Sequence, residues 1–235
     1  MDPHTARVHA VFEQVAPYYD SMNDWMSLGL HRIWKRLAVA RLDLHPQHRI
    51  LDLAGGTGDL SRLMAPKLQD PGHISIVDIN AAMLHQGQDR LINAGITQGL
   101  DWIQADAEAL PIQNDYFDRA IMGFGLRNTT HIDQVLSEIL RVLRPGGRLL
   151  VLEFSTPRPG LINRFYQCYS QKIIPALGEW LHQDAESYQY LIDSIRLHPD
   201  QAQLKKMFET AGFTGCSYQN LHEGIVAIHI GHKPC

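Results

Sequence analysis

The chain has 235 residues, of which 45% are hydrophobic and 20% charged, and its net charge is 21 − 25 = −4. This composition is typical of a folded globular protein and excludes a largely disordered one. The charge gives no basic excess for nucleic acid, and no apolar run approaches the ~18 residues of a membrane-spanning helix. The 3 cysteines form neither a disulfide framework nor a zinc motif. Because the opening residues also lack a signal-peptide pattern, we expect a cytoplasmic protein without a nucleic-acid partner.

The region up to about residue 44 is predicted to be helical. Apolar residues recur at helical spacing from Val8 to Val15, and Pro17 then interrupts the pattern. A second apolar stripe follows Gly29 and consists of Ile33, Trp34, Leu37 and Ala38.

Residues 49–155 alternate predicted strands with predicted helices. Strands separated by helices need crossover connections, so this pattern predicts a parallel sheet. Pro145-Gly146-Gly147 predicts a turn between a helix at 132–143 and the last of these strands. The five predicted strands are Ile50–Ala54, Ile74–Ile79, Leu100–Gln104, Phe117–Phe124 and Arg148–Phe154.

The remaining residues, 156–235, mix helical and strand patterns. Apolar residues follow helical spacing between Ile162 and Ile173 and again between Leu204 and Ala211. Two β-like runs, 216–221 and 225–230, flank His222-Glu223-Gly224 and predict a terminal antiparallel pair.

A glycine-rich loop, Asp52-Leu53-Ala54-Gly55-Gly56-Thr57-Gly58, leads from the first strand into a helix. Glycines let a ligand approach the backbone, and the N–H groups of the helix start face it. Asp78 ends the next strand, where a βαβ unit holds ribose hydroxyls. The chain has Ser61 where a dinucleotide fingerprint requires glycine. Asp52 would repel a pyrophosphate but suits an ammonium and a sulfonium, which favours S-adenosylmethionine over a dinucleotide. Because a strand, a glycine cluster, a helix and a spaced acid coincide here, a bound nucleoside is favoured over a tight turn without a ligand.

Asp106 and Ala107 follow the third strand and so belong to the same edge of the sheet. The Asp106 carboxylate could accept from the adenine amino group, with the Ala107 backbone N–H beside it. A turn or helix-capping aspartate is the alternative interpretation, and the spacing leaves both open.

From about Val8 to Gly231 the chain resembles the ubiquinone/menaquinone biosynthesis C-methyltransferase family. The resemblance implies a Rossmann-like class I methyltransferase fold: a seven-stranded, mostly parallel sheet with a C-terminal antiparallel hairpin and an N-terminal helical lid. Four segments carry it: residues 12–24 continuing to His31-Arg32-Ile33-Trp34-Lys35, the Asp52–Leu60 loop, Gly123-Phe124-Gly125-Leu126-Arg127-Asn128, and Ser187-Tyr188-Gln189-Tyr190-Leu191 with Ser194-Ile195-Arg196 and Pro199.

The resemblance also implies one domain over residues 1–235, divided into a lid (1–44), a core that binds S-adenosylmethionine (49–155), and substrate-side helices with the hairpin (156–235). It implies methylation of a ring carbon of a prenylated quinol. Many members have serine where this chain has Gly123, so a hydroxyl contact near the donor is missing here. The cofactor-binding residues expected are Asp52, Gly56, Thr57, Gly58, Asp78, Asp106, Ala107 and Gly123.

Methyl transfer to a quinol carbon requires in-line orientation and a ring made electron-rich by loss of a hydroxyl proton. Arg127 is a poor base but could hold a phenolate or a water, and a structural ion pair is its alternative role. His31 has a suitable pKa range, although a lone histidine is more often structural. The catalytic candidates are Arg127, Asn128, His31 and Asp20.

The N-terminal helices and the 187–199 segment are expected to enclose the acceptor. The apolar stripe from Ile162 to Ile173 is interpreted as core packing, with an isoprenoid wall or a transient membrane surface as the alternative. The substrate-binding candidates are Tyr18, Tyr19, Asn23, Tyr188, Tyr190 and Arg196.

Several partners and functions stay open on the sequence. A quinone-synthesis complex, a homodimer and peripheral attachment at the inner membrane face are compatible with it. Other functional classes are a methyltransferase of another phenol or carbon acid, an NAD(P)-dependent oxidoreductase, and a non-catalytic subunit that binds S-adenosylmethionine. No metal is expected, because the histidine pairs His45/His48 and His229/His232 lack further ligands nearby.

Overall fold

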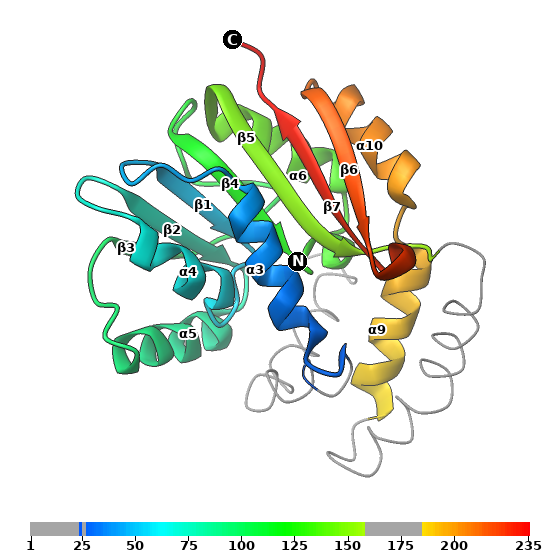
Figure 1. The fold of residues 1–235 in the computed structure, drawn as a ribbon, viewed down its shortest axis with the longest axis horizontal. Coiled ribbons are helices and arrows are strands. Elements are labelled where there is room, and N and C mark those ends of the chain that lie inside the picture. Colours follow the sequence, from blue (N-terminus) through cyan, green and yellow to red (C-terminus); the bar gives the residue numbers. More distant parts are fainter. Residues whose placement is uncertain (1–23, 25–26, 158–184) are drawn as a thin grey trace.

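The computed structural model describes residues 24, 27–157 and 185–235, and in this part of the chain a central sheet carries helices on both faces (Figure 1). The sheet has seven strands in the order β3-β2-β1-β4-β5-β7-β6. They are β1 (Arg49–Leu53), β2 (His73–Asp78), β3 (Leu100–Gln104), β4 (Phe117–Gly123), β5 (Leu143–Phe154), β6 (Thr214–Leu221) and β7 (Val226–His232).

The connectivity creates one reversal in the sheet. From β1 the chain moves outward to β2 and β3, then returns to pair β4 with the other side of β1. All pairs from β3 to β5 are parallel, and β7 runs antiparallel to both β5 and β6. The predicted parallel sheet with a terminal antiparallel pair is therefore confirmed. In sheets of this kind, ligands bind at the carboxyl ends of the strands beside the reversal.

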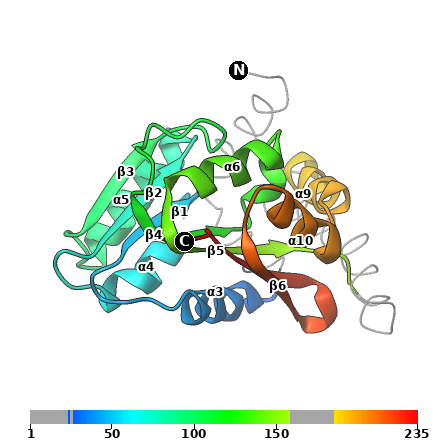
Figure 2. The ribbon, with the colours of Figure 1, turned by 90° about the horizontal axis from the view of Figure 1, so that it is seen from above.

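Helices cover both faces, as Figure 2 shows from above. On one face α6 and α10 pack on Leu51, Leu53 and Val151; on the other, α3, α4 and α5 pack on Ile50, Ile76 and Leu150. Alternate residues of one strand thus enter opposite halves of the core, as the period of two requires. The helices are α3 (Leu30–Arg41), α4 (Asp59–Met64), α5 (Ala81–Asn93), α6 (Ile132–Val142), α9 (Ala185–Leu197) and α10 (Gln201–Thr210), with short 3₁₀ turns η2 (Ala65–Lys67), η3 (Leu126–Asn128) and η5 (His222–Gly224).

Two details differ from the sequence-based expectation. The predicted turn at Pro145-Gly146-Gly147 lies inside β5, because Leu143 already pairs with Phe117 before Arg148 pairs with Arg119. The extra residues form a bulge, and Gly146 supplies its positive φ of 75°.

The buried side of α3 also differs from the predicted stripe. Ile33 and Leu37 are exposed, whereas His31 and Lys35 are buried together with Trp34. The two polar side chains are stabilised there by acidic partners, Asp24 and Asp59. A pattern based on hydrophobicity alone cannot predict a helix face that is buried through ion pairs.

Among the described residues, no helix is both long enough and apolar enough to cross a bilayer. The predicted helix at Val8–Val15 and the stripe from Ile162 to Ile173 lie outside the described residues.

Candidate functional site

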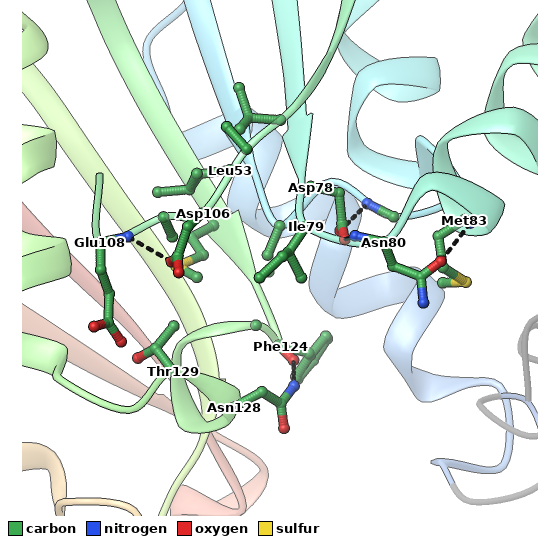
Figure 3. A pocket seen from close by; sticks show the side chains of 18 of the residues that line it. Leu53, Asp78, Ile79, Asn80, Met83, Asp106, Glu108, Phe124, Asn128 and Thr129 are labelled. Carbon is green, nitrogen blue, oxygen red and sulfur yellow. Dashed lines mark hydrogen bonds between the residues drawn. The ribbon is translucent and has the colours of Figure 1, made fainter. Parts of the chain in front are cut away.

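A pocket opens at the carboxyl ends of β1, β2, β3 and β4, beside the reversal of the sheet. It encloses about 800 Å³, including the solvent at its mouth. Figure 3 shows Asp78 and Asn80 on one side of it, Asp106 and Glu108 on the other, and Phe124 and Asn128 below. The position of the pocket beside the sheet reversal is where ligands bind in sheets of this kind. The sequence analysis predicted the candidate ligand contacts at this same carboxyl edge of the sheet.

The glycine loop is bound to the end of β2 through Asp78. The Gly56 backbone N–H donates to Asp78 Oδ2 at 2.9 Å, and the Asn80 N–H donates to Oδ1 at 2.9 Å. Gly56 has a φ of +52°, a conformation that glycine adopts without strain. Gly56 and Asp78 both line the pocket, and their contact with a donor stays a prediction.

Thr57 and Gly58 contribute to the loop rather than to the main pocket. Thr57 is buried, and its Oγ1 accepts a hydrogen bond from Arg90 at 3.3 Å. Gly58 is the N-cap residue of α4. Thr57 lines a smaller pocket beneath the loop, so its predicted donor contact depends on that side of the loop.

Asp52 lies fully buried beneath the glycine loop. Its Oδ2 accepts the Ser61 hydroxyl at 2.6 Å and the Ser61 backbone N–H at 3.0 Å. The other oxygen, Oδ1, has no hydrogen-bond partner in the structure. Burial raises the pKa of Asp52 to about 6. Ser61, whose identity argued against a dinucleotide loop, therefore holds this carboxylate in place.

The segment after β3 forms another wall of the pocket. The Asp106 carboxylate accepts the Glu108 backbone N–H at 2.9 Å, which confirms a turn role. Asp106 and Ala107 both line the pocket, so contact with an adenine stays a prediction. Glu108 accepts N–H groups of Thr130 and His131 and thereby connects this wall to the segment after β4.

Strand β4 ends in a strained turn at the pocket floor. Phe124 has a φ of 60° and packs its ring against Phe154 at a centroid distance of 4.9 Å. Gly123 lies beside Leu60, and a Cβ at position 123 would be 2.8 Å from Leu60 Cδ1. Gly123 lines both pockets, and its contact with the cofactor stays a prediction.

Arg127 faces the protein interior rather than the pocket. Its guanidinium donates to the Phe124 carbonyl and to Glu153, at 2.8 Å from Oε1, and only 5% of the Arg127 side chain is exposed. The structural ion pair, the alternative role for this residue, is thus what the geometry favours. Arg127 holds the Phe124–Asn128 turn in position, and direct contact with a quinol oxygen has no support in this arrangement.

Asn128 and Tyr190 meet at the pocket edge, although 62 residues separate them. The Tyr190 hydroxyl donates to Asn128 Oδ1 at 3.1 Å, and Asn128 lines the pocket. The structure thus brings a predicted catalytic residue and a predicted substrate residue together. Tyr188 lies on α9, but its side chain is outside the described part, and Arg196 is exposed in the last turn of α9.

His31 is buried and pairs with the partly exposed Asp24, at 2.8 Å between Nε2 and Oδ1. Burial lowers the pKa of His31 below its ordinary value despite this partner, which favours the neutral ring. Neither residue lines the main pocket, so a role as base stays a prediction. Tyr18, Tyr19, Asp20 and Asn23 lie outside the described residues.

The sequence analysis missed several residues of the site. Asn80 lines the main pocket and caps α5 by accepting the Met83 N–H, a capping pattern that the sequence contains. Glu108 and Thr129 also line the pocket. Lys35 lines the pocket beneath the loop. Within the described residues, no three His, Cys, Asp or Glu side chains are grouped as metal ligands would be.

Comparison with known sequences gives matches over nearly the whole chain. Residues 1–233 match the ubiE/COQ5 methyltransferase family. A protein named ubiquinone/menaquinone biosynthesis C-methyltransferase UbiE from Coxiella burnetii is 50% identical over 99% of this chain and 93% of its own length. The protein of the same name from Methylococcus capsulatus is 50% identical over 96% and 91%.

Solved structures with low sequence identity share the fold. A methyltransferase from Aquifex aeolicus, described as dependent on S-adenosylmethionine, has a TM-score of 0.62 at 12% identity and covers 85% of this chain and 89% of its own. A phosphoethanolamine N-methyltransferase from Haemonchus contortus, solved with S-adenosylmethionine, has a TM-score of 0.63 at 15% identity and covers 85% and 52%. At these identities the likeness concerns the fold, which is the predicted Rossmann-like methyltransferase architecture.

Proposed function

This chain belongs to the ubiE/COQ5 methyltransferase family, and on that premise we propose that it methylates a ring carbon of a prenylated quinol with S-adenosylmethionine as donor. The proposed acceptors are 2-methoxy-6-polyprenyl-1,4-benzoquinol, demethylmenaquinol, or both. The acceptor class follows from the names of relatives that are 50% identical over nearly the full chain.

One observation carries the donor assignment: the buried Asp52 carboxylate beside the glycine loop has an oxygen without a protein partner. An unsatisfied buried acceptor is costly unless a ligand satisfies it. The ammonium of S-adenosylmethionine is a suitable donor for that oxygen. Asp78 lies at the end of the adjacent strand and would accept the ribose hydroxyls while it holds Gly56.

When bound, S-adenosylmethionine supplies an electrophilic methyl group on a sulfonium. The chain's own residues would supply orientation and exclusion of water. Phe124 forms an apolar floor that Phe154 and Trp34 hold from below. Arg127 fixes the turn that carries Phe124 and Asn128. A reacting carbon held in line with the methyl can gain ~7–11 kcal/mol of the barrier from orientation alone.

The acceptor also has to lose a hydroxyl proton as its ring carbon becomes nucleophilic. We assign the end of the pocket near Asn128 and Tyr190 to the quinol hydroxyl, because the linked amide and phenol can orient that group or a water. Arg127 supports these groups from below and does not touch the ring. The substrate is lipid-soluble, so we propose that the protein meets it peripherally, at the inner face of the membrane.

Methyl transfer from labelled S-adenosylmethionine to two reduced acceptors, run side by side, tests the proposal. A prenylated methoxy-benzoquinol and a prenylated naphthoquinol are offered in detergent micelles, with the oxidised quinones as controls. The Asp78→Ala variant, expected to bind the donor poorly, reports background transfer, and Asp101→Asn, an exposed site on β3, serves as its matched control.

Label in either reduced quinol supports the proposal and identifies the acceptor. Donor binding without product from either acceptor, in micelles and in vesicles, would contradict it. The chain would then be a methyltransferase of another phenol or carbon acid, or a subunit that only binds the donor.

A further inference from the structure

A small second pocket lies beneath the glycine loop and contains charges of both signs. Lys35, Asp52 and Asp59 line it together with the backbone of Gly55, Gly56 and Thr57. It shares Ala54, Gly56 and Gly123 with the main pocket, so the two adjoin at the loop. A ligand whose nucleoside lies in the main pocket can therefore extend a short polar chain into this one.

The positive side of this pocket is a largely buried cluster of three ionised groups, of which Arg90 is the most exposed. Lys35 Nζ lies 2.6 Å from Asp59 Oδ2, and Arg90 lies 2.9 Å from Asp59 Oδ1. Although burial raises it, the two cations hold the pKa of Asp59 below its ordinary value. Two cations and one carboxylate leave one net positive charge, and an ammonium has three donors, so Lys35 can bind an anion while it keeps Asp59.

The negative side is Asp52, which is fully buried and keeps Oδ1 without a partner. The same pocket thus holds an acceptor for an ammonium and a net cation for a carboxylate. An α-amino acid group carries this pair of opposite charges. A ligand group with two adjacent charges of the same sign would not match the pocket. Lys35 itself is only 8% exposed, a burial that its pairing with Asp59 permits, so its ammonium is held in place at the pocket wall.

We propose that Lys35 binds the carboxylate of the donor's amino-acid end, opposite the ammonium held by Asp52. The inference rests on the proposed function in one respect, that the donor is S-adenosylmethionine. Lys35 comes from α3, whereas Asp52 and Asp59 come from the glycine loop and α4. The donor's amino-acid end then connects α3 to the loop, and Lys35 makes the site specific for a donor with an intact carboxylate.

Equilibrium binding of three adenosyl ligands tests this assignment. S-adenosylmethionine carries both charges, decarboxylated S-adenosylmethionine lacks only the carboxylate, and 5′-methylthioadenosine lacks the whole amino-acid group. The unaltered protein should prefer the first to the second by at least about tenfold, the size of a charge-assisted hydrogen bond. In Lys35→Met this ratio should fall to about threefold or less, while the affinity for 5′-methylthioadenosine stays unchanged.

Two further variants make the result specific. Arg36→Met removes an exposed cation from the same helix and should keep the full ratio. Asp59→Asn frees Lys35 from its acidic partner, so the preference for S-adenosylmethionine over its decarboxylated form should stay the same or increase. This variant provides a test if Lys35→Met does not fold.

Three outcomes would overturn the inference: no preference in the unaltered protein, a full ratio in Lys35→Met, or an equal loss of affinity for all three ligands. An equal loss would mean that Lys35 only stabilises the loop. A protein that has the expected ratios and yet methylates neither quinol would contradict the proposed acceptor and leave the role of Lys35 intact.

Discussion

The two sides of the pocket are constructed in different ways. On the donor side, most groups belong to one βαβ unit: Ser61 holds Asp52 from nine residues away, and Gly56 binds Asp78 at the end of the next strand. On the acceptor side, a third element joins β4 and β5: Glu153 holds Arg127, and Tyr190 of α9 holds Asn128 from 62 residues away. The donor side therefore rests mainly on β1, α4 and β2, with Lys35 added from α3, whereas the acceptor side exists only when β4, β5 and α9 pack together.

This difference predicts where the molecule is vulnerable. A change in the donor side should alter ligand affinity and leave the fold intact. A change in the acceptor side should alter stability and the acceptor reaction together.

The largest effect is expected from breaking the buried ion pair on the acceptor side. Arg127→Met leaves Glu153, whose side chain is 1% exposed, without its cation. Removing one partner of a buried pair costs about 3–5 kcal/mol of unfolding free energy, which for a domain of this size lowers Tm by roughly 10 °C. Turnover should be lost as the Phe124–Asn128 turn shifts, while donor affinity stays nearly normal. Urea and thermal unfolding, with donor binding, measure these quantities.

The control is Arg144→Met, because the Arg144–Asp118 pair is partly exposed and should contribute less than about 1 kcal/mol. The double variant Arg127→Met/Glu153→Leu should regain most of the lost stability, since no buried charge is left alone. Normal unfolding of Arg127→Met combined with lost turnover would contradict the positioning role and restore direct contact with the quinol.

On the donor side, pH should change affinity through Asp52. Burial raises the pKa of this carboxyl from 3.8 to about 6 in the folded protein, so protonation removes its charge below that pH. Affinity for S-adenosylmethionine should fall as pH decreases through 6, by at most about tenfold per pH unit. The stability contribution has the opposite direction: it is present below pH 3.8 and is lost as pH rises through 6.

Binding measured between pH 5 and 8 tests this prediction. The affinity for 5′-methylthioadenosine, which lacks the ammonium, should not follow this titration. In Asp52→Asn the affinity for S-adenosylmethionine should lose its pH dependence as well. The same slope in Asp52→Asn as in the unaltered protein would assign the titration to another group.

A smaller effect is expected where the acceptor side meets α9. Tyr190→Phe removes the hydroxyl that donates to Asn128 and keeps the ring, which is largely buried. The loss of one neutral hydrogen bond of about 1 kcal/mol should lower kcat/KM for the quinol about fivefold and leave the donor Kd unchanged. Tyr218→Phe, at a half-exposed position on edge strand β6, is the matched control. A change in donor Kd alone would move Tyr190 to the donor side.

The same difference explains what could be predicted from the sequence. The strands of the core were predicted within one or two residues, except at the start of β5, because buried strands produce continuous apolar runs between turn residues. Asp78 and the glycine loop were found because a βαβ unit separates them by a fixed spacing. These signals lie within one βαβ unit, which supplies Asp52, Gly56 and Asp78 of the donor side.

The long-range contacts had no such signal. Nothing near Arg127 in the sequence indicates that Glu153 buries it, and nothing near Lys35 indicates Asp59. Arginine and lysine are expected at the surface until the packing of α3 and β5 is known. The predicted stripe of α3 was right at Trp34 and Ala38 and wrong at Ile33 and Leu37, because His31 and Lys35, each with an acidic partner, are buried beside the apolar residues instead.

The smallest effect, on the donor Kd, is expected at Gly123, where the donor side and the acceptor side of the pocket meet. Gly123→Ser introduces the hydroxyl that the family resemblance led us to expect at this position, but its Cβ would lie 2.8 Å from Leu60 Cδ1. That atom ends a flexible side chain, so a rotamer change costing about 0.5–1.5 kcal/mol can make room. A new contact of the hydroxyl with the donor offsets this cost, and we expect the donor Kd to stay within about threefold of its original value.

The double variant Gly123→Ser/Leu60→Val separates the two opposing contributions. Removing one methylene from Leu60 relieves its contact with the introduced hydroxymethyl group, so the donor should bind more tightly to the double variant than to either single one. A double-mutant cycle on the donor Kd should then give a coupling of about 0.5–1 kcal/mol, because the two side chains touch. Additive effects would mean that Leu60 does not limit position 123. The serine would then be excluded by the turn at Phe124, and Gly123 would belong with the acceptor side.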